Sequence, residues 1–209
     1  MTIKKIKLIE GVGVNDVDYR VQVKEGIYVD GKSKQRLIWV CPFYVKWRDM
    51  LRRCYSDKYH INLPTYIGCS VADEWLSLST FKSWMETQDW EGKHLDKDIL
   101  FPSNKVYGPS NCVFVDTKVN TFLTDCAAAR GEWPIGVYFN KRDSKFLARC
   151  RSVVTGKQQH LGYFDTPEEA HQAWLSFKLE QAKILAAGQT DERVAKALIA
   201  KYENYEKDA

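Results

Sequence analysis

The chain has 209 residues, of which 44% are hydrophobic and 28% charged, a globular composition that excludes wholesale disorder, collagen and coiled-coil arrays. Its apolar runs span only a few residues, far fewer than the roughly 20 that cross a bilayer, and its start lacks the apolar core of a signal peptide. The net charge of +4 is too small to indicate nucleic-acid binding by itself. The six cysteines form no Cys-x-x-Cys pair, which favours reduced thiols in a cytoplasm.

The cations are concentrated near the end of the chain. Residues 134–164 hold a single acid, Asp143, against a set of cations. These are Lys141, Arg142, Lys145, Arg149, Arg151 and Lys157. Aromatic residues are also frequent, at 13% with seven tryptophans. A basic surface rich in aromatic rings is typical of phosphate contact and base stacking, while a solvated face over a Trp-rich core is the alternative interpretation.

The first 85 residues predict a hairpin followed by two helices. Residues 1–40 alternate loosely, with turn signals at Glu25-Gly26 and Asp30-Gly31, which predicts a short hairpin. From Phe43 the apolar positions recur at helical spacing, namely Trp47, Met50, Leu51 and Cys54. A second amphipathic helix is expected to begin near Ser79, with Phe81, Trp84 and Met85 on its inner side.

Residues 94–123 predict a ββα unit. The run from His94 to Leu100 alternates as a strand, with Leu95, Lys97 and Ile99 on one face. A loop rich in turn residues follows, and Cys112–Val115 reads as a second strand. Asp116 then caps a helix that turns Val119 and Phe122 inward and carries Asn120.

The last third predicts three strands followed by helices. The strands are expected at Gly136–Phe139, Lys145–Arg151 and Gln159–Phe164, joined by turns. Thr166 and Pro167 then begin a helix with a capping box, and a final helix starts near Asp191. The fold class is therefore α+β, with a three-stranded antiparallel sheet packed on a helix and a further C-terminal helix.

The ββα unit carries oxygen ligands on two elements. A carboxylate on a strand, Asp96, and an amide on the following helix, Asn120, are the pair expected to hold one divalent ion. Hard cations such as Mg²⁺ or Mn²⁺ accept such oxygens and keep several waters, which leaves room for a phosphate. The alternative is that Asp96 forms a turn at the strand end and Asn120 is an ordinary polar residue of its helix.

The segment from about Cys41 to Leu123 carries the motifs Trp47-x-x-Met50-x-x-Arg53-Cys54, Asp73-Glu74-Trp75-Leu76, Phe81, Leu95-Asp96-Lys97, Asn104-x-x-Tyr107-x-Pro109-x-Asn111-Cys112 and Asn120. With these motifs it resembles the HNH nucleases, especially phage-encoded and homing-type members. The resemblance implies metal ligation by Asp96 and Asn120 and an orienting role for Asn111. Lys97 occupies the general-base position, so either His94 supplies the imidazole from two residues upstream or Lys97 clamps the scissile phosphate.

The last third carries the residues Gly136-Val137, Lys145-Phe146-x-Ala148-Arg149, Arg151 and Leu161-Gly162-x-Phe164-x-Thr166-x-Glu168-Glu169-Ala170-x-x-Ala173-Trp174. With these residues it resembles the APETALA-type domain of plant ethylene-response factors, which also occurs fused to phage homing endonucleases. The resemblance implies that the sheet enters the major groove of DNA through Tyr138, Asn140, Arg149, Arg151 and His160. Independently, Arg149 and Arg151 share one strand face, where guanidinium groups can meet guanine edges.

Other basic residues extend the expected contact with DNA. Lys141 follows the first strand of the C-terminal sheet, and Arg52 and Arg53 lie on the helix that begins near Phe43. A zinc site built from Cys41, Cys54, Cys69 and Cys112 is a weaker alternative, because these residues lack the close pairs of zinc ribbons. Buried thiols that act as small hydrophobic side chains are the preferred interpretation.

The sequence therefore predicts a DNA endonuclease that hydrolyses phosphodiester bonds with Mg²⁺ or Mn²⁺ and is targeted by a C-terminal DNA-binding domain. The expected domains are a hairpin extension at 1–40, an HNH-like region at 41–128, a linker at 129–133, an APETALA-type domain at 134–187 and a helix at 188–209. The expected partner is double-stranded DNA, in the cytoplasm of a phage-infected bacterium and without a membrane; a host or phage protein and a second copy are further candidate partners.

Two alternatives to the endonuclease stay open. The first is a phage-type DNA-binding protein, or an inhibitor of a host factor, that uses the same folds without hydrolysis; Lys97 at the general-base position favours it. The second is a protein that binds a partner through its final helix and never meets DNA.

Overall fold

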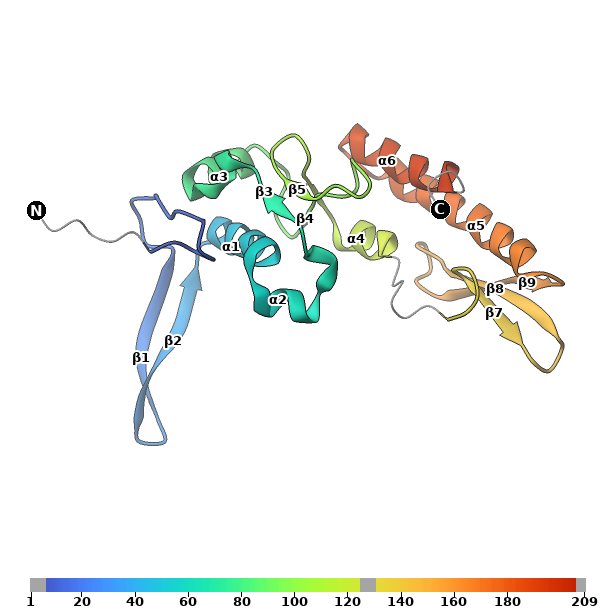
Figure 1. The fold of residues 1–209 in the computed structure, drawn as a ribbon, viewed down its shortest axis with the longest axis horizontal. Coiled ribbons are helices and arrows are strands. Elements are labelled where there is room, and N and C mark those ends of the chain that lie inside the picture. The colour runs from blue at the N-terminus through green and yellow to red at the C-terminus, as the bar shows by residue number, and fades with distance from the viewer. Residues whose placement is uncertain (1–6, 125–130, 206–209) are drawn as a thin grey trace, which may run out of the picture. The chain divides into compact units, whose positions relative to one another are not determined.

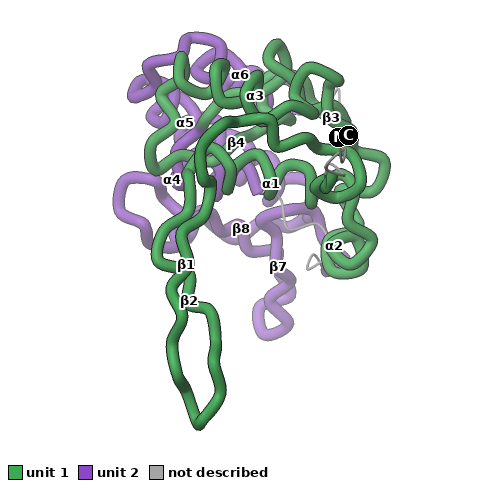
Figure 2. The backbone as a smooth tube through the Cα atoms, turned by 90° about the vertical axis from the view of Figure 1, so that its left-hand side faces the viewer, with its two compact units in different colours: residues 1–114 green, residues 115–209 purple. Residues whose placement is uncertain are grey.

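The computed structural model describes residues 7–124 and 131–205. The chain divides into two compact units, Met1–Phe114 and Val115–Ala209, which Figure 2 distinguishes by colour. Helices account for 39% and strands for 25% of the structure, and one sheet has three antiparallel strands, which confirms the predicted mixture of elements. Within the described ranges, no helix combines the length and apolarity needed to span a membrane.

The first unit begins with a two-stranded antiparallel ribbon. Strand β1 (Gln22–Val29) pairs with β2 (Lys32–Val40), as Figure 1 shows. Asp30 and Gly31 connect them with positive φ angles of 51° and 72°, as a two-residue hairpin turn requires. The predicted hairpin is confirmed. Its turn lies at Asp30-Gly31, whereas Glu25-Gly26, the other turn signal, lies within β1.

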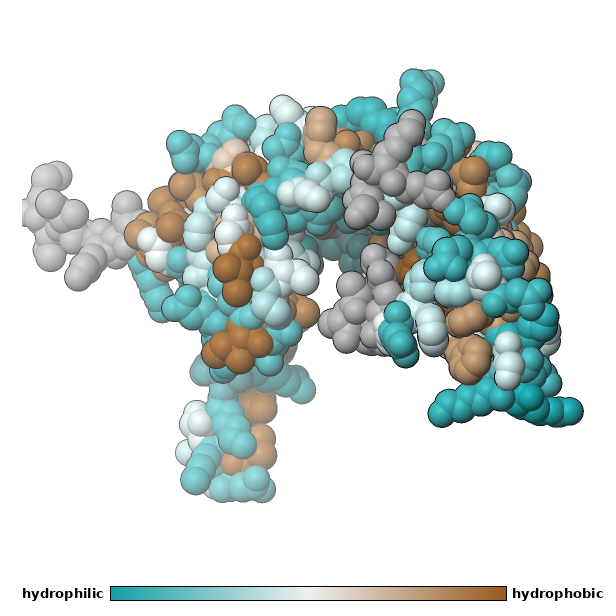
Figure 3. All heavy atoms as spheres, turned by 45° about the vertical axis from the view of Figure 1, so that its right-hand side comes forward, coloured by the Kyte–Doolittle hydropathy of each residue, from teal (hydrophilic) through white to brown (hydrophobic). Residues whose placement is uncertain are grey.

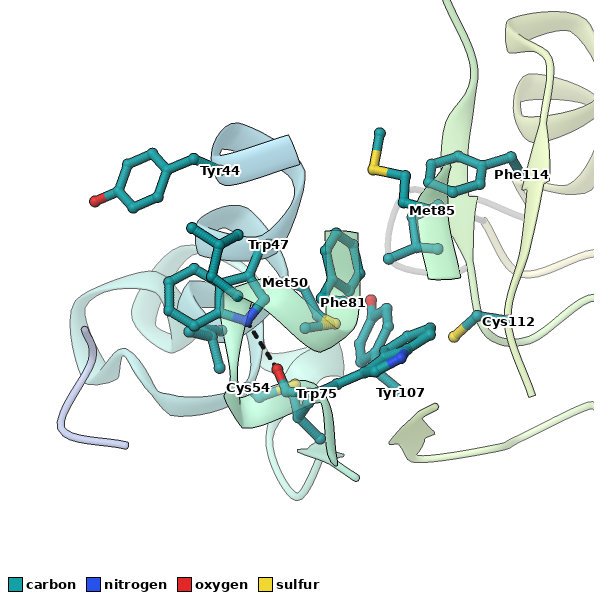
Figure 4. Packing of buried hydrophobic residues seen from close by; sticks show 14 of the residues in the cluster. Tyr44, Trp47, Met50, Cys54, Trp75, Phe81, Met85, Tyr107, Cys112 and Phe114 are labelled. Carbon is teal, nitrogen blue, oxygen red and sulfur yellow. Dashed lines mark hydrogen bonds between the residues drawn. The ribbon is translucent and has the colours of Figure 1, made fainter. Parts of the chain in front are cut away.

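Helix α1 (Pro42–Tyr55) and helix α3 (Leu78–Met85) build the core of the first unit. Their predicted inner residues are buried, except for the half-buried Trp84. Trp47 donates its indole N–H to the carbonyl of Trp75 at 2.7 Å, inside the cluster drawn in Figure 4. The hydrogen bond satisfies the only polar atom of a fully buried indole.

Short elements connect these helices. Between α1 and α3 lie α2 (Asp57–Asn62), the 3₁₀ turn Pro64–Tyr66, strand β3 (Ser70–Val71) and the 3₁₀ turn Asp73–Leu76. Strand β3 pairs in parallel with β5 (Val106–Tyr107), a long-range pairing that the sequence analysis did not predict.

The predicted strand from His94 to Leu100 is much shorter in the structure. Strand β4 spans His94–Asp96 and pairs with β6 (Val113–Val115). After Asp96 the chain turns, because Asp96 Oδ1 accepts hydrogen bonds from the backbone N–H groups of Asp98 and Ile99, both at 2.8 Å. Such side-chain-to-backbone bonds close an Asx-type turn. The strand prediction is therefore wrong beyond Asp96.

Helix α4 (Thr117–Leu123) begins at its predicted cap, where Asp116 Oδ1 accepts from the N–H of Val119 at 2.8 Å. Two cations meet its carboxyl end: Lys178 Nζ donates to the Phe122 carbonyl at 3.0 Å and Lys201 Nζ to the Leu123 carbonyl at 3.3 Å. Cations at a helix C-terminus are favourable. These bonds explain why α4 groups with the second unit, whereas the sequence analysis assigned it to a region ending at 128. Residues 129 and 130 of the expected linker lie outside the described residues.

The second unit contains the predicted three-stranded sheet, in the order β7 (Val137–Asn140), β8 (Lys145–Arg151) and β9 (Gln158–Phe164). Helix α5 (Pro167–Ala187) begins with the expected capping box, in which Thr166 Oγ1 accepts from the Glu169 N–H at 3.2 Å. Helix α6 (Glu192–Glu203) packs on α5.

Helix α5 covers one face of this sheet. The apolar cluster at the contact is centred on Val137, Ala148 and Ala170. Gly136, with a φ of +81°, precedes β7, and a Cβ atom there would lie 2.0 Å from the Trp174 ring. The indole therefore packs on bare backbone, so only glycine fits at this position.

Candidate nucleic-acid interface

The sheet of the second unit has a face that α5 does not cover. Strand residues alternate between faces, and Val137, Ala148 and Cys150 are buried toward the helix side. The residues on the opposite side are Tyr138, Leu147, Arg149, Arg151, Gln158, His160 and Tyr163, and we call this set the open face. Cross-strand pairing places Tyr138 opposite Leu147, Leu147 opposite Tyr163, and Arg149 opposite His160.

A β-bulge brings two aromatic residues of β9 to the open face. His160 and Tyr163 are three positions apart, so simple alternation would put them on opposite faces. The register shifts between Ala148 and Arg149, and Leu161 is the unpaired residue on β9. As a result the rings of His160 and Tyr163 meet at 4.9 Å. Tyr163 was not predicted as a contact residue, and the local signal that could have indicated it is Gly162, which has a φ of +139° beside the bulge.

The side chains of the open face form an aromatic and basic surface. The Arg149 guanidinium lies 5.8 Å from the centre of the Tyr138 ring. Tyr138 is 53% exposed and Tyr163 is 50% exposed, whereas Leu147 between them is 4% exposed. The two tyrosines pair with the buried leucine across the strands and present half of their own surface to solvent.

The remaining predicted contacts lie at the ends of the strands. Arg151 is exposed, and its Nε donates to the Gly156 carbonyl of the β8–β9 turn at 2.7 Å. Asn140 closes the other turn, because its Nδ2 donates to Asp143 Oδ2 at 2.8 Å and its Oδ1 accepts from the Arg142 N–H. Lys141 is exposed in that turn. Tyr138, Arg149 and His160 are thus brought together, while Asn140 belongs to the turn.

The two predicted arginines of α1 differ in their surroundings. Arg52 is exposed, 5.1 Å from the Tyr59 ring and 3.6 Å from an Asp49 carboxylate oxygen. Arg53 is half-buried, 5.7 Å from the Tyr66 ring, and it interacts with the Tyr107 hydroxyl. Burial raises the pKa of Tyr107 far above its usual value, so this hydroxyl stays neutral. Arg52 therefore faces solvent, while Arg53 is directed into the unit.

Lys97 is held inside the first unit. Its side chain is nearly buried, and Nζ donates to Asp98 Oδ1 at 2.5 Å and to the Asn104 carbonyl at 2.7 Å. Asn104 Nδ2 donates in return to the Lys97 carbonyl at 2.9 Å and to the Val106 carbonyl at 2.7 Å. These reciprocal bonds close the loop between β4 and β5. The Lys97 ammonium therefore has a structural role in this loop.

The other residues expected at the metal site are spread over both units. His94 and Asp96 alternate on β4, so they share one face of the strand, and both are half-buried. Asn111 lies in the turn before β6, where its N–H donates to the Gly108 carbonyl. Asp96 belongs to the first unit and Asn120 to the second. Among the described residues, no three His, Cys, Asp or Glu side chains are grouped to hold a metal ion.

The described cysteines are buried, as expected for thiols that act as small hydrophobic side chains. Cys41, Cys54, Cys69, Cys112 and Cys150 are buried free thiols, while Cys126 lies outside the described residues. Burial raises the pKa of the Cys54 and Cys112 thiols to about 12. The buried thiols pack among hydrophobic residues, as small hydrophobic side chains do.

Comparison with family models, curated proteins and solved structures found no match to this chain.

Proposed function

We propose that the chain binds double-stranded DNA through the open face of its C-terminal sheet. The convergence of Tyr138, Arg149, His160 and Tyr163 on this face is the single observation that supports the proposal most directly. Guanidinium groups bind phosphates and the O6 and N7 atoms of guanine, and a sheet can enter the major groove. Tyrosine and histidine add hydrogen bonds to the phosphate backbone.

The charges around the open face support the same partner. Arg149 and Arg151 lie on it, and Lys141, Arg142 and Lys157 are exposed in the turns at its edges. The nearby acids are engaged: Asp143 bonds Asn140 and lies near Arg142, and Asp165 pairs with Lys145. The sheet therefore presents an excess of positive charge, and phosphate contacts of this kind weaken as salt rises.

The test compares variants of the full chain on a random-sequence duplex. Arg149→Gln removes a charge from the open face, and Lys196→Gln removes one from an exposed position on α6. We expect Arg149→Gln to raise Kd about tenfold and to lower the salt dependence by about one phosphate contact, while Lys196→Gln stays within twofold of the wild type. Equal effects of the two variants would reject the open face as the interface.

A third variant separates charge from shape. Arg149→Lys keeps the positive charge but loses the planar fork of the guanidinium. If Arg149 contacts only phosphates, Arg149→Lys should bind like the wild type; if it reads a base, binding to a preferred sequence should fall while binding to random duplexes is retained.

Metal-dependent hydrolysis of the bound duplex is a second candidate. The observation that favours it is the fixed orientation of Asp96, whose Oδ1 is held by two backbone N–H groups on the strand face that also carries His94. Mg²⁺ is often bound by one or two carboxylates with several waters, so Asp96 fits as one ligand through its other oxygen. A bound Mg²⁺ or Mn²⁺ would neutralise charge on a phosphodiester. Asp96 would hold the ion, and His94 would position or accept the proton of an attacking water.

Asp96→Asn is the discriminating variant for hydrolysis, because the amide oxygen can still accept the two turn hydrogen bonds while the charge is lost. We expect any Mg²⁺-dependent cleavage to fall at least 100-fold with folding and DNA affinity retained. Lys97→Met is the companion variant. If Lys97 is the general base, this variant should lose cleavage; if Lys97 is a structural cation, the variant should lower the free energy of unfolding. Cleavage that persists in Asp96→Asn would exclude this site, and DNA binding without cleavage by the wild type would leave a non-hydrolytic binding protein.

A further inference from the structure

The ribbon of β1 and β2 projects from the first unit and is exposed on both faces. Its base is anchored where Val21 and Val40 pack against the core and the Cys41 N–H donates to the Val21 carbonyl at 2.9 Å. Figure 3 shows the projecting end with apolar and hydrophilic side chains side by side. An isolated two-stranded hairpin is only marginally stable in water, so a ribbon of this length is better explained by contact with a partner than by packing.

One face of the ribbon carries a row of cations. Lys34 is paired with Ile27, Lys32 with Val29 and Arg36 with Glu25, and paired residues share a face. Lys32, Lys34 and Arg36 are therefore aligned along β2, and all three are exposed. We call this the basic face. Its one acid, Glu25, is ion-paired with Arg36, an exposed pair that is weak enough to exchange for another anion.

The opposite face differs in charge. Lys24 is paired with Leu37, and Tyr28 with Ser33, one residue out of phase with the basic face. Lys24 is the only cation there, and Tyr28 is 81% exposed. The basic face thus carries a row of three cations, and the opposite face carries one lysine, Lys24, which can serve as a control.

The dimensions of the ribbon fit a DNA groove. Eight residues of β1 extend about 26 Å, and the two strands lie about 4.8 Å apart. A B-DNA major groove is about 12 Å wide and 8.5 Å deep and admits a two-stranded ribbon. The ribbon is thus long enough to reach across a groove and narrow enough to enter it.

We propose that the β1–β2 ribbon is a second DNA-contacting element, which lies in a major groove with its basic face against the phosphate backbone. The inference rests on the proposed function only for the choice of double-stranded DNA as the partner. Charge complementarity between the aligned cations and the phosphates selects this partner over a protein strand, because lysines along a ribbon oppose pairing with another strand.

The experiment measures duplex binding by the full chain over a series of salt concentrations. Lys32→Gln/Lys34→Gln should lower the slope of log K against log salt by about 2, from about 0.9 per lost phosphate contact, and should raise Kd at least tenfold. Lys34→Gln should raise Kd by several fold, whereas Lys24→Gln on the opposite face should stay within twofold of the wild type. Lys32→Arg/Lys34→Arg, which keeps the charges, should bind like the wild type.

The results overturn the inference in two ways. If Lys34→Gln and Lys24→Gln have equal effects, or if the arginine variant binds as weakly as the glutamine variant, the basic face does not contact phosphates. If Lys32→Gln/Lys34→Gln causes dimerisation and leaves DNA affinity unchanged, the lysines only prevent strands from pairing with each other.

The same measurements separate this inference from the proposed function. If Arg149→Gln weakens binding and the ribbon variants do not, the ribbon fails alone; the reverse result rejects the open face alone. A wild-type chain that binds no duplex DNA rejects both.

Discussion

The loop after β4 and the open face of the C-terminal sheet both carry charged and polar side chains, but these side chains have different partners. In the loop, Lys97 bonds Asp98 and Asn104, and Asp96 bonds the backbone of its own turn. On the open face, Arg149 and His160 contact aromatic rings and remain exposed. The difference shows that polar residues in a motif-like pattern can use their hydrogen-bonding groups to stabilise the fold. Polar residues that stay exposed and do not stabilise the fold are better candidates for binding.

The largest effect is expected on the covered face of the sheet. Gly136→Ala should destabilise the chain by about 3 kcal/mol or more, because the new methyl group would collide with Trp174 at a position with positive φ. Gly156→Ala is the matched control, since Gly156 also has a positive φ, of 66°, but faces open space. We expect it to cost about 1 kcal/mol from backbone strain alone. Urea unfolding measures both, and equal losses would mean that the Trp174 contact contributes nothing.

A smaller loss is expected in the loop after β4. Lys97→Met keeps most of the apolar stem and removes the ammonium, so the Asn104 carbonyl loses its donor and the free energy of unfolding should fall by about 2 kcal/mol. Lys105→Met, in the same loop but exposed, should change it by less than about 1 kcal/mol. A Lys97→Met chain as stable as the wild type would show that the ammonium is not structural, and would return it to the candidates for catalysis.

Asp16 is another carboxylate whose hydrogen bonds stabilise the fold, and its contribution to stability should depend on pH. Its oxygens accept from the hydroxyls of Ser77 and Ser79 and from the Ser79 N–H. Burial acts to raise the pKa of Asp16, but these hydrogen bonds outweigh it and lower the pKa from 3.8 to about 2. The stabilisation is therefore complete above about pH 4 and is lost as pH falls toward 2.

Because Asp16 is exposed, solvent screening limits this contribution to about 1 kcal/mol. Asp16→Asn should lose about that amount at pH 7, and the difference from the wild type should shrink between pH 4 and pH 2. Asp18→Asn, a nearby exposed position, serves as the control in urea unfolding at each pH. A difference that is constant with pH would contradict the hydrogen-bonded carboxylate.

The smallest effect is expected on the open face. Arg149→Gln should change the free energy of unfolding by less than about 0.5 kcal/mol, since the exposed guanidinium only lies over the Tyr138 ring. Thermal unfolding of Arg149→Gln, the variant also used for DNA binding, measures this change in stability. If the free energy of unfolding falls by more than about 1 kcal/mol, Arg149 stabilises the fold as Lys97 does, and the contrast between the two residues is lost.

Local signals were enough to predict most elements. The apolar stripe of α1 and the capping box of α5 depend on residues within one or two turns, so the sequence alone located both helices. Leu95, Lys97 and Ile99 were predicted to share one face of a strand, and all three are buried, although the strand ends at Asp96. The alternation could not indicate that the Lys97 ammonium would donate hydrogen bonds to Asp98 and Asn104 of its own loop.

The features that escaped prediction depend on competing or distant interactions. The strand ended at Asp96 because a side-chain turn replaced the ladder, a choice that alternation does not encode. The pairing of β3 with β5 joins segments more than 30 residues apart. Tyr163 reached the open face only because the register shifts next to Ala148. Each case needs the partner strand or turn to be known first.

Contact between the open face and duplex DNA can be tested by an NMR titration of the isotope-labelled chain with a random-sequence duplex. We expect the signals of Tyr138, Arg149, His160 and Tyr163 to shift or broaden, those of Ala148 and Cys150 on the helix side to change less, and added salt to reverse the effect. A duplex that binds while the signals of the four open-face residues stay unchanged would contradict this contact.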